Sequence, residues 1–194
     1  YHSINIFNFK IFYLNMNNEQ LLQQIKSMTS EIFNEVVSIR RKIHANPELS
    51  YHEHETSAFV ADYLTKLGLQ VTKNVAGTGV VALLNPEKSE NTLALRADMD
   101  ALPIQEQNAC EYASQNPGVM HACGHDAHTA SLLGTAVILS KLKSEVNGCV
   151  KFIFQPAEEK LPGGASLMIK EGVLKNPEVK GIVGQHVMPL IECG

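Results

Sequence analysis

The chain has 194 residues, of which 44% are hydrophobic, 19% charged and 6% aromatic, a composition typical of a globular protein and not of a disordered one. Sixteen basic and twenty acidic residues give a net charge of -4, which argues against a general nucleic-acid binder, because neutralising phosphates needs a basic excess. No run of about 18 apolar residues occurs, so the sequence predicts no membrane-spanning helix.

The first fifteen residues differ in composition from the rest of the chain. They are rich in aromatic residues and asparagine, whereas sequence of ordinary character begins at Met16. They also lack the cationic start and the small-residue cleavage site of a secretory signal. We expect residues 1–15 to be an upstream extension, unstructured or a short β-prone arm, and residues 16–194 to form one unit.

The sequence predicts two helices in the first part of the chain. Apolar residues recur in steps of three and four over residues 21–44, which predicts an amphipathic helix that ends before Pro47. A second helix fits residues 53–67, with Gly68 as its C-cap.

The pattern then alternates between short strands and helices. Asp126 is a plausible N-cap for the third helix. Alternating helices and strands predict an α/β layered domain around a largely central sheet. The predicted strands are residues 69–75, 79–85, 91–98, 149–156 and 181–187, and the further helices are residues 126–143 and 165–171.

Polar side chains able to do chemistry stand where the apolar strands stop. Because ligand crevices of open α/β sheets lie beyond the carboxyl ends of the strands, these side chains should converge on one rim. Thiolate, imidazole and carboxylate groups together are typical of a zinc site, and carboxylate with imidazole also suits manganese. The residues are Asp98 and Asp100, Glu158 and Glu159, His186, and, in the turn before the third helix, His121, Cys123 and His125.

Each of these groups also has an ordinary structural explanation. The aspartates could be turn residues, and Cys123 a small buried hydrophobe. Glu158 and Glu159 are harder to explain, because they follow an apolar strand and a proline. Neighbouring side chains of an extended segment point to opposite sides, so one glutamate could bind metal while the other faces a water molecule.

Two apparent motifs do not fit their usual function. Residues 52–56 (HEHET) look like the HExxH motif of zinc peptidases, but Thr56 stands where the second histidine is required. We therefore expect a polar loop and the start of a helix there. A nucleophilic pair of Cys123 and His125 is disfavoured, since the base of such a pair acts across space.

Five segments of the chain resemble the M20 family of metallopeptidases, and more narrowly its amidohydrolase branch, which includes hippurate, N-acyl-amino-acid and auxin-conjugate hydrolases. The resemblance implies a zinc-exopeptidase-like, three-layer α/β domain with a central mixed sheet. Family members are longer, so the chain resembles the N-terminal portion of the catalytic domain, truncated before the lid or dimerisation domain. The segments are RRKIHANPELSYHEHET, LALRADMDALPI, MHACGHDAHTA, QPAEEKLPGGA and GQHVMP.

The resemblance also implies roles for individual residues. Glu158 looks like the general base, and Asp100 looks like the family's catalytic aspartate, which orients a metal-bound histidine. Asp98 stands where other relatives have a ligand histidine, and we leave it out of the ligand set. The implied metal ligands are Cys123, His125, Glu159 and His186.

The function implied is hydrolysis of the amide bond of N-acyl amino acids to a carboxylic acid and a free amino acid. Two divalent ions, manganese or zinc, are expected per full-length subunit, with self-association through the missing domain. Four cysteines without a CxxC spacing favour a reducing, cytoplasmic setting. No nucleic-acid or membrane partner is expected.

Two alternatives remain open from the sequence. A truncated non-catalytic fragment or pseudoenzyme would hold at most one metal, although an intact Glu158 opposes a structural role. An aminopeptidase or dipeptidase of the same superfamily is disfavoured by the Cys-Gly-His motif, through resemblance alone.

Overall fold

The computed structural model describes residues 18–188 and 191, so the expected extension at residues 1–15 lies outside the described residues. Every helix and strand predicted above is confirmed, with ends that differ by at most three residues. The elements are α1 (Asn18–Ala45), α2 (His54–Lys66), β1 (Gln70–Val75), β2 (Gly79–Leu84), the short 3-10 helix η1 (Pro86–Lys88), β3 (Thr92–Asp98), α3 (His125–Lys141), β4 (Cys149–Gln155), α4 (Gly164–Lys170) and β5 (Val179–Gly184).

The strands form one five-stranded mixed sheet in the order β1-β2-β4-β3-β5. The pairs β1–β2 and β2–β4 are antiparallel, whereas β3 runs parallel to both β4 and β5. The carboxyl ends of β3, β4 and β5 therefore meet at the same edge of the sheet. The predicted central mixed sheet is confirmed, and its parallel half is the part that gathers the polar strand ends.

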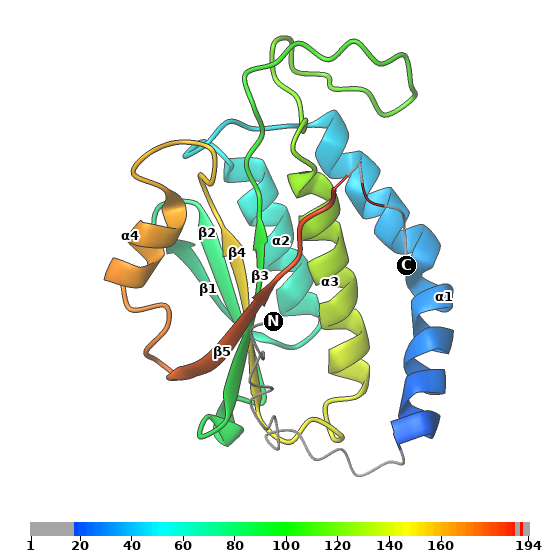
Figure 1. Cartoon of the computed structure of the whole chain (residues 1–194), viewed down its shortest axis with the longest axis vertical. Coiled ribbons are helices and arrows are strands. Elements are labelled where there is room, and N and C mark those ends of the chain that lie inside the picture. The colour runs from blue at the N-terminus through cyan, green and yellow to red at the C-terminus, as the bar shows by residue number, and fades with distance from the viewer. Residues whose placement is uncertain (1–17, 189–190, 192–194) are drawn as a thin grey trace, which may run out of the picture.

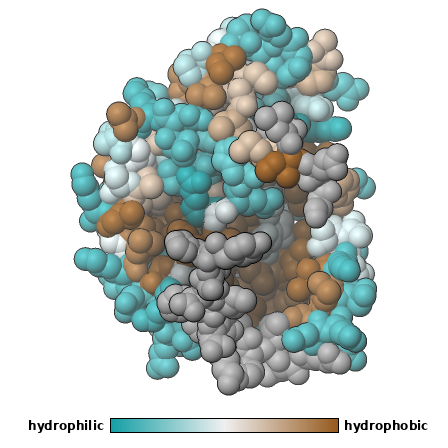
Figure 2. All heavy atoms as spheres, in the orientation of Figure 1, coloured by the Kyte–Doolittle hydropathy of each residue, from teal (hydrophilic) through white to brown (hydrophobic). Residues whose placement is uncertain are grey.

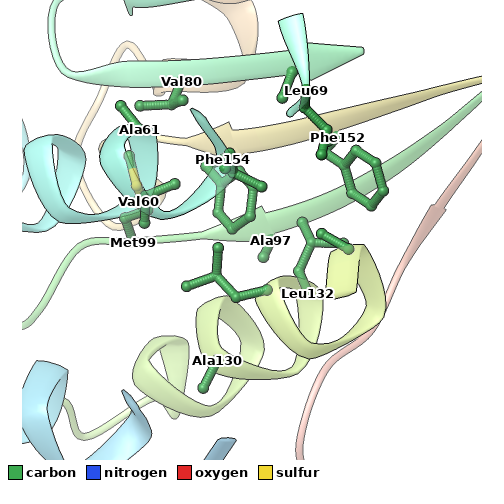
Figure 3. Close-up of a cluster of buried hydrophobic side chains, with 14 of the residues drawn as sticks. Val60, Ala61, Leu69, Val80, Ala97, Met99, Ala130, Leu132, Phe152 and Phe154 are labelled. Atoms are coloured by element: carbon green, nitrogen blue, oxygen red, sulfur yellow. The ribbon is translucent and has the colours of Figure 1, made fainter. Parts of the chain in front are cut away.

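Helices cover both faces of the sheet, which confirms the three-layer architecture (Figure 1). The larger core lies under α1, α2 and α3, where Phe152 and Phe154 of β4 point toward Leu132 of α3 (Figure 3). On the other face a smaller cluster packs Met168 of α4 against Ile153. Every residue of β4 is buried, as expected for a strand with both faces covered.

β5 is one of the two edge strands of the sheet, the other being β1. Its apolar side chains Ile182 and Val183 are 53% and 54% exposed, and apolar residues gather on the face viewed in Figure 2. An edge strand with exposed apolar side chains is a template for pairing with another chain.

None of the helices in residues 18–188 is both long and apolar enough to cross a lipid bilayer.

The N-terminus of α3 is not capped as the sequence analysis expected. Gly124, with φ of 87°, occupies the N-cap position, and no side chain caps the helix there. The buried Asp126 carboxylate instead accepts hydrogen bonds from Arg40 Nε at 2.7 Å and His44 Nδ1 at 2.8 Å, both on α1. These charge-assisted hydrogen bonds connect the start of α3 to α1.

His44 also contacts Glu106, which lies in the loop between β3 and α3. His44 Nε2 lies 3.0 Å from Glu106 Oε1, and the second oxygen of Glu106 accepts the Ser114 amide at 2.6 Å. Burial alone would raise the pKa of Glu106, but hydrogen bonds from Ser114 and His44 outweigh it and lower the pKa from 4.5 to about 2. The Glu106 carboxylate therefore stabilises the fold above pH 4.5, and this stabilisation is lost as the pH falls towards 2.

We expect Glu106→Gln to lower the melting temperature by about 3–12 °C near neutral pH, because a hydrogen bond to a charged group stabilises by about 1.5–3 kcal/mol. The difference from the parent protein should shrink as the pH falls from 4.5 towards 2, because the unfolded parent takes up a proton at Glu106 in this range while the folded carboxylate stays ionised down to about pH 2. Thermal unfolding followed by circular dichroism at a series of pH values measures this. A difference that stays constant with pH would contradict the assignment.

Candidate metal centre

The structure brings the predicted site residues other than His121 together where β3, β4 and β5 end, beside the N-terminus of α3. Figure 1 shows these strand ends and the start of α3. His125, the first residue of α3, belongs to three groups of side chains whose ligand atoms lie within 4.8 Å of one another. The groups are Cys123 with His125 and His186, Asp98 with His125 and His128, and His125 with Glu158 and Glu159.

The His125 ring has one paired and one unpaired nitrogen. Nδ1 lies 2.9 Å from the carbonyl oxygen of Asp100, to which it donates. Nε2 is buried and has no hydrogen-bond partner among the described residues. Three carboxylate oxygens lie 3.7–4.0 Å from Nε2, one each from Asp98, Glu158 and Glu159. An unpaired ring nitrogen facing several carboxylates fits a cation held between them.

Cys123 and His186 add a thiol and a second imidazole. His186 Nδ1 lies 2.7 Å from the carbonyl oxygen of Val187, which can only accept, so Nδ1 carries the proton. In the neutral ring the other nitrogen, Nε2, has a lone pair, and it lies 3.5 Å from Cys123 Sγ. Burial, followed by the nearby Glu159 carboxylate, raises the pKa of Cys123 to about 11. A divalent ion would reverse this effect, because a coordinating thiol loses its proton.

Asp100 connects His125 to the loop after β4. One carboxylate oxygen, Oδ1, lies 3.2 Å from His125 Nδ1. The other accepts the Ser50 hydroxyl at 2.6 Å and the Glu159 amide at 3.0 Å. Burial alone would raise the pKa of Asp100, but these hydrogen bonds hold it well below its usual range. Asp100 is thus an ionised acceptor with the geometry of a carboxylate that orients a ligand histidine.

The two glutamates do not lie on opposite sides of an extended segment, and that expectation is wrong. Ala157 has a φ of 46°, in the left-handed region, which bends the chain directly after β4. As a result, Glu158 and Glu159 both turn their carboxylates toward His125, at 4.0 and 3.8 Å from Nε2. The pattern of residue types did not reveal this bend, because alanine rarely adopts a positive φ.

A second buried histidine, His128, was missed by the sequence analysis. The Val187 amide donates to its Nε2 at 2.9 Å, so the ring proton is on Nδ1, which donates to Asp98 at 2.7 Å. Arg96 pairs with the other oxygen of Asp98 at 2.7 Å. His128 thereby joins the segment after β5 to α3. Its spacing of three residues from His125, on one helix face, was the available signal.

His121 lies apart from the candidate metal ligands. It belongs to none of the clustered groups, and its ring centroid is 6.4 Å from that of His44. Neither of its ring nitrogens has a partner among the described residues. Burial lowers the pKa of His121 to about 4, so the ring is neutral near pH 7. The sequence analysis placed His121 in the same turn as Cys123, but its side chain points into the protein interior.

Gly124, the residue before α3, leaves room for Val187 in the segment after β5 to lie close to the start of that helix. A Cβ atom there would overlap the Val187 side chain at Cγ2, which would have to shift. We expect Gly124→Ala to weaken zinc or manganese affinity by about 10-fold or more. The reason is that disturbing the residues that support metal ligands typically lowers metal affinity about 10- to 100-fold. Gly118→Ala is the matched control, because Gly118 has a similar positive φ of 78° with nothing within 4 Å of the added atom. Calorimetric titration that gives equal losses in both variants would contradict this prediction.

The chain is similar in sequence to curated proteins that are hydrolases by name. The N-acyl-L-amino acid amidohydrolase of Geobacillus stearothermophilus is 46% identical over 172 residues, which are 89% of this chain and 46% of that protein. Thermostable carboxypeptidase 2 of Saccharolobus solfataricus is 48% identical over 169 residues, 86% of this chain and 42% of that protein. The chain spans less than half the length of these relatives.

A solved structure is similar over the same part of the chain. The Bacillus subtilis YXEP protein, described as a dinuclear metal binding peptidase from the M20 family, has a TM-score of 0.75 and 40% identity. The similarity covers 85% of this chain and 45% of that one. Residues 94–193, just over half of the chain, match the family described as peptidase family M20/M25/M40. The chain belongs to the peptidase family M20/M25/M40.

Proposed function

We propose that residues 16–194 form the N-terminal part of a metal-dependent catalytic domain that hydrolyses the amide bond of N-acyl amino acids. The observation that carries this proposal is the unpaired, buried Nε2 of His125 among three carboxylates. The name of the Geobacillus relative supports an N-acyl amino acid as the substrate class.

We infer that two divalent ions, zinc or manganese, bind per full-length subunit. The mixed set of sulfur, nitrogen and oxygen donors around His125 supports both metals. When bound, such ions lower the pKa of a coordinated water and polarise the amide carbonyl. The residues proposed to hold them are Cys123, His125, Glu159 and His186.

The remaining residues of the site would bind no metal and would move or hold protons. Asp100 keeps the proton of His125 on Nδ1 and so leaves Nε2 free to bind. Glu158, whose side chain is 43% exposed, is open to solvent and substrate. We infer that Glu158 takes a proton from the attacking water and returns it to the leaving amine, acting as general base and then as general acid.

Localisation and assembly are proposed on separate grounds. The thiols of Cys110, Cys123 and Cys149 are free, which supports a reducing compartment, for which we propose the cytoplasm. Self-association is proposed to use the lid or dimerisation domain of the longer family members.

A substrate panel tests the proposed reaction. A full-length version of the protein, extended to the length of its relatives, is assayed with N-acyl amino acids and with unblocked dipeptides, before and after metal removal. We expect hydrolysis of the N-acyl compounds only, lost with a chelator and restored by zinc or manganese. Peptides are the second candidate substrate, because one relative is named a carboxypeptidase. Hydrolysis of dipeptides alone would favour that reading.

A further inference from the structure

Glu53 is a fully buried carboxylate with no part in the metal centre as described so far. It lies in the HEHET segment, where the expected loop and helix start are confirmed, since α2 begins at His54; the burial of Glu53 was not foreseen. No salt bridge within the described part of the chain involves it. Its two oxygens accept hydrogen bonds from the Ala157 amide, at 2.7 Å, and from the Thr78 hydroxyl.

The position of Glu53 in the chain does not explain this burial. Glu53 is the N-cap residue of α2, yet its side chain makes no capping hydrogen bond. The carboxylate of Glu48 caps the helix instead, accepting the amides of Glu55 and Thr56 at 3.0 and 2.8 Å. The Glu53 side chain is therefore free to reach across the core to the loop after β4.

That loop carries Glu158 and Glu159. Ala157, fully buried, adopts its left-handed φ of 46° directly before them. The amides of Glu158 and Glu159 both bond to the Asp100 carboxylate. Together with the bond to Glu53, three successive amides are held by two buried carboxylates. An unusual backbone conformation persists only where its surroundings fix it in this way.

We propose that Glu53 is a positioning residue for the metal centre: by holding the Ala157 amide it sets the bend that turns Glu158 and Glu159 toward His125. The inference rests on the proposed function, since it takes these two glutamates as working groups. Without an acceptor at this place, the Ala157 amide would be buried and unpaired, and the bend would relax to satisfy it. The requirement is for an acceptor at the end of a side chain of this length; a negative charge is not needed.

Two variants of Glu53 distinguish the effect of its side-chain length from the effect of its charge. Glu53→Gln keeps the length and a carbonyl acceptor for Ala157 but removes the charge. Glu53→Asp keeps the charge but is shorter by one methylene and withdraws the acceptor. Thr78→Val is the matched control, because it removes the other hydrogen bond of Glu53 and leaves the contact with Ala157 in place.

Metal affinity of the full-length protein is the first readout, with Mn²⁺ as the probe in calorimetric titration. We expect Glu53→Asp to weaken Mn²⁺ binding by about 10-fold or more, and Glu53→Gln and Thr78→Val to stay within about 3-fold of the parent. An Asp variant equal to the parent, or a Gln variant as impaired as the Asp variant, would overturn the proposal. The Gln comparison keeps the test decisive if the Asp variant fails to fold.

Amide hydrogen exchange in chelator is the second readout, and it depends on neither metal nor activity. In Glu53→Asp the amides of residues 157–159 should exchange about 10-fold faster or more, while those of β4 stay protected. Unchanged exchange would overturn the positioning role even if the enzyme is active. A parent protein that neither binds Mn²⁺ nor hydrolyses amides would instead refute the proposed function, and the exchange experiment would still decide whether Glu53 holds the bend.

Discussion

Glu158→Gln in a full-length version of the protein is expected to lower kcat for an N-acyl amino acid by about 10²-fold or more, with its metal content unchanged. The reason is that general acid–base catalysis contributes about 10²- to 10⁴-fold, and the amide of glutamine cannot accept the proton. Glu158 Oε2 lies 4.0 Å from His125 Nε2, close enough to reach a water beside the candidate metal ligands. Steady-state kinetics and elemental analysis of the same preparation give both quantities.

Glu159→Gln is the matched control for this experiment, because the two glutamates are adjacent and face the same nitrogen. We expect the Glu159 variant to lose metal, since its carboxylate is a proposed ligand. If Glu158→Gln loses metal to the same extent, the two residues do not have separate roles. If neither variant changes activity or metal content, both glutamates are surface charges.

Cys123→Ser should weaken metal binding by about 100-fold or more. A thiolate is a strong ligand for zinc, whereas a serine hydroxyl keeps its proton near neutral pH. Loss of a residue that only supports a ligand already lowers metal affinity about 10- to 100-fold, so loss of a ligand should lower it at least as much. Competition with a chromogenic chelator measures the affinity of parent and variant.

Alkylation tests the same residue without a substitution. Because burial and the nearby carboxylates raise the pKa of Cys123 to about 11, the metal-free thiol should react with iodoacetamide slowly at neutral pH and faster in alkaline buffer. Bound metal should block that reaction. Cys110, a half-buried free thiol outside the candidate metal-binding groups, is the internal control and should react equally in both states. Equal reactivity of Cys123 with and without metal would exclude it as a ligand.

The arrangement of the elements could be predicted from the sequence because it depends on local patterns. Apolar spacing located α1, and short apolar runs located β3 and β4. Since β3, β4 and β5 run parallel, placing polar residues at their carboxyl ends was enough to predict that these residues converge.

The side-chain contacts that the sequence did not predict join residues far apart in the chain. Asp126 has a helix-cap position in the sequence, but its partner His44 is 82 residues away. Glu53 contacts an amide 104 residues away, and this contact accompanies the bend that directs Glu158. No periodicity encodes such pairings, because they arise only when the sheet and its helices are packed together.

Anomalous diffraction at the zinc or manganese absorption edge tests the central claim most directly, namely that the residues around His125 form a metal centre. Crystals of the metal-loaded protein should show a peak about 2.0–2.2 Å from His125 Nε2, with Cys123 Sγ at about 2.3 Å if the metal is zinc. Glu159 and His186 should complete the ligands around one or two such peaks. A metal-loaded crystal whose only peaks lie away from His125 Nε2 would contradict the account.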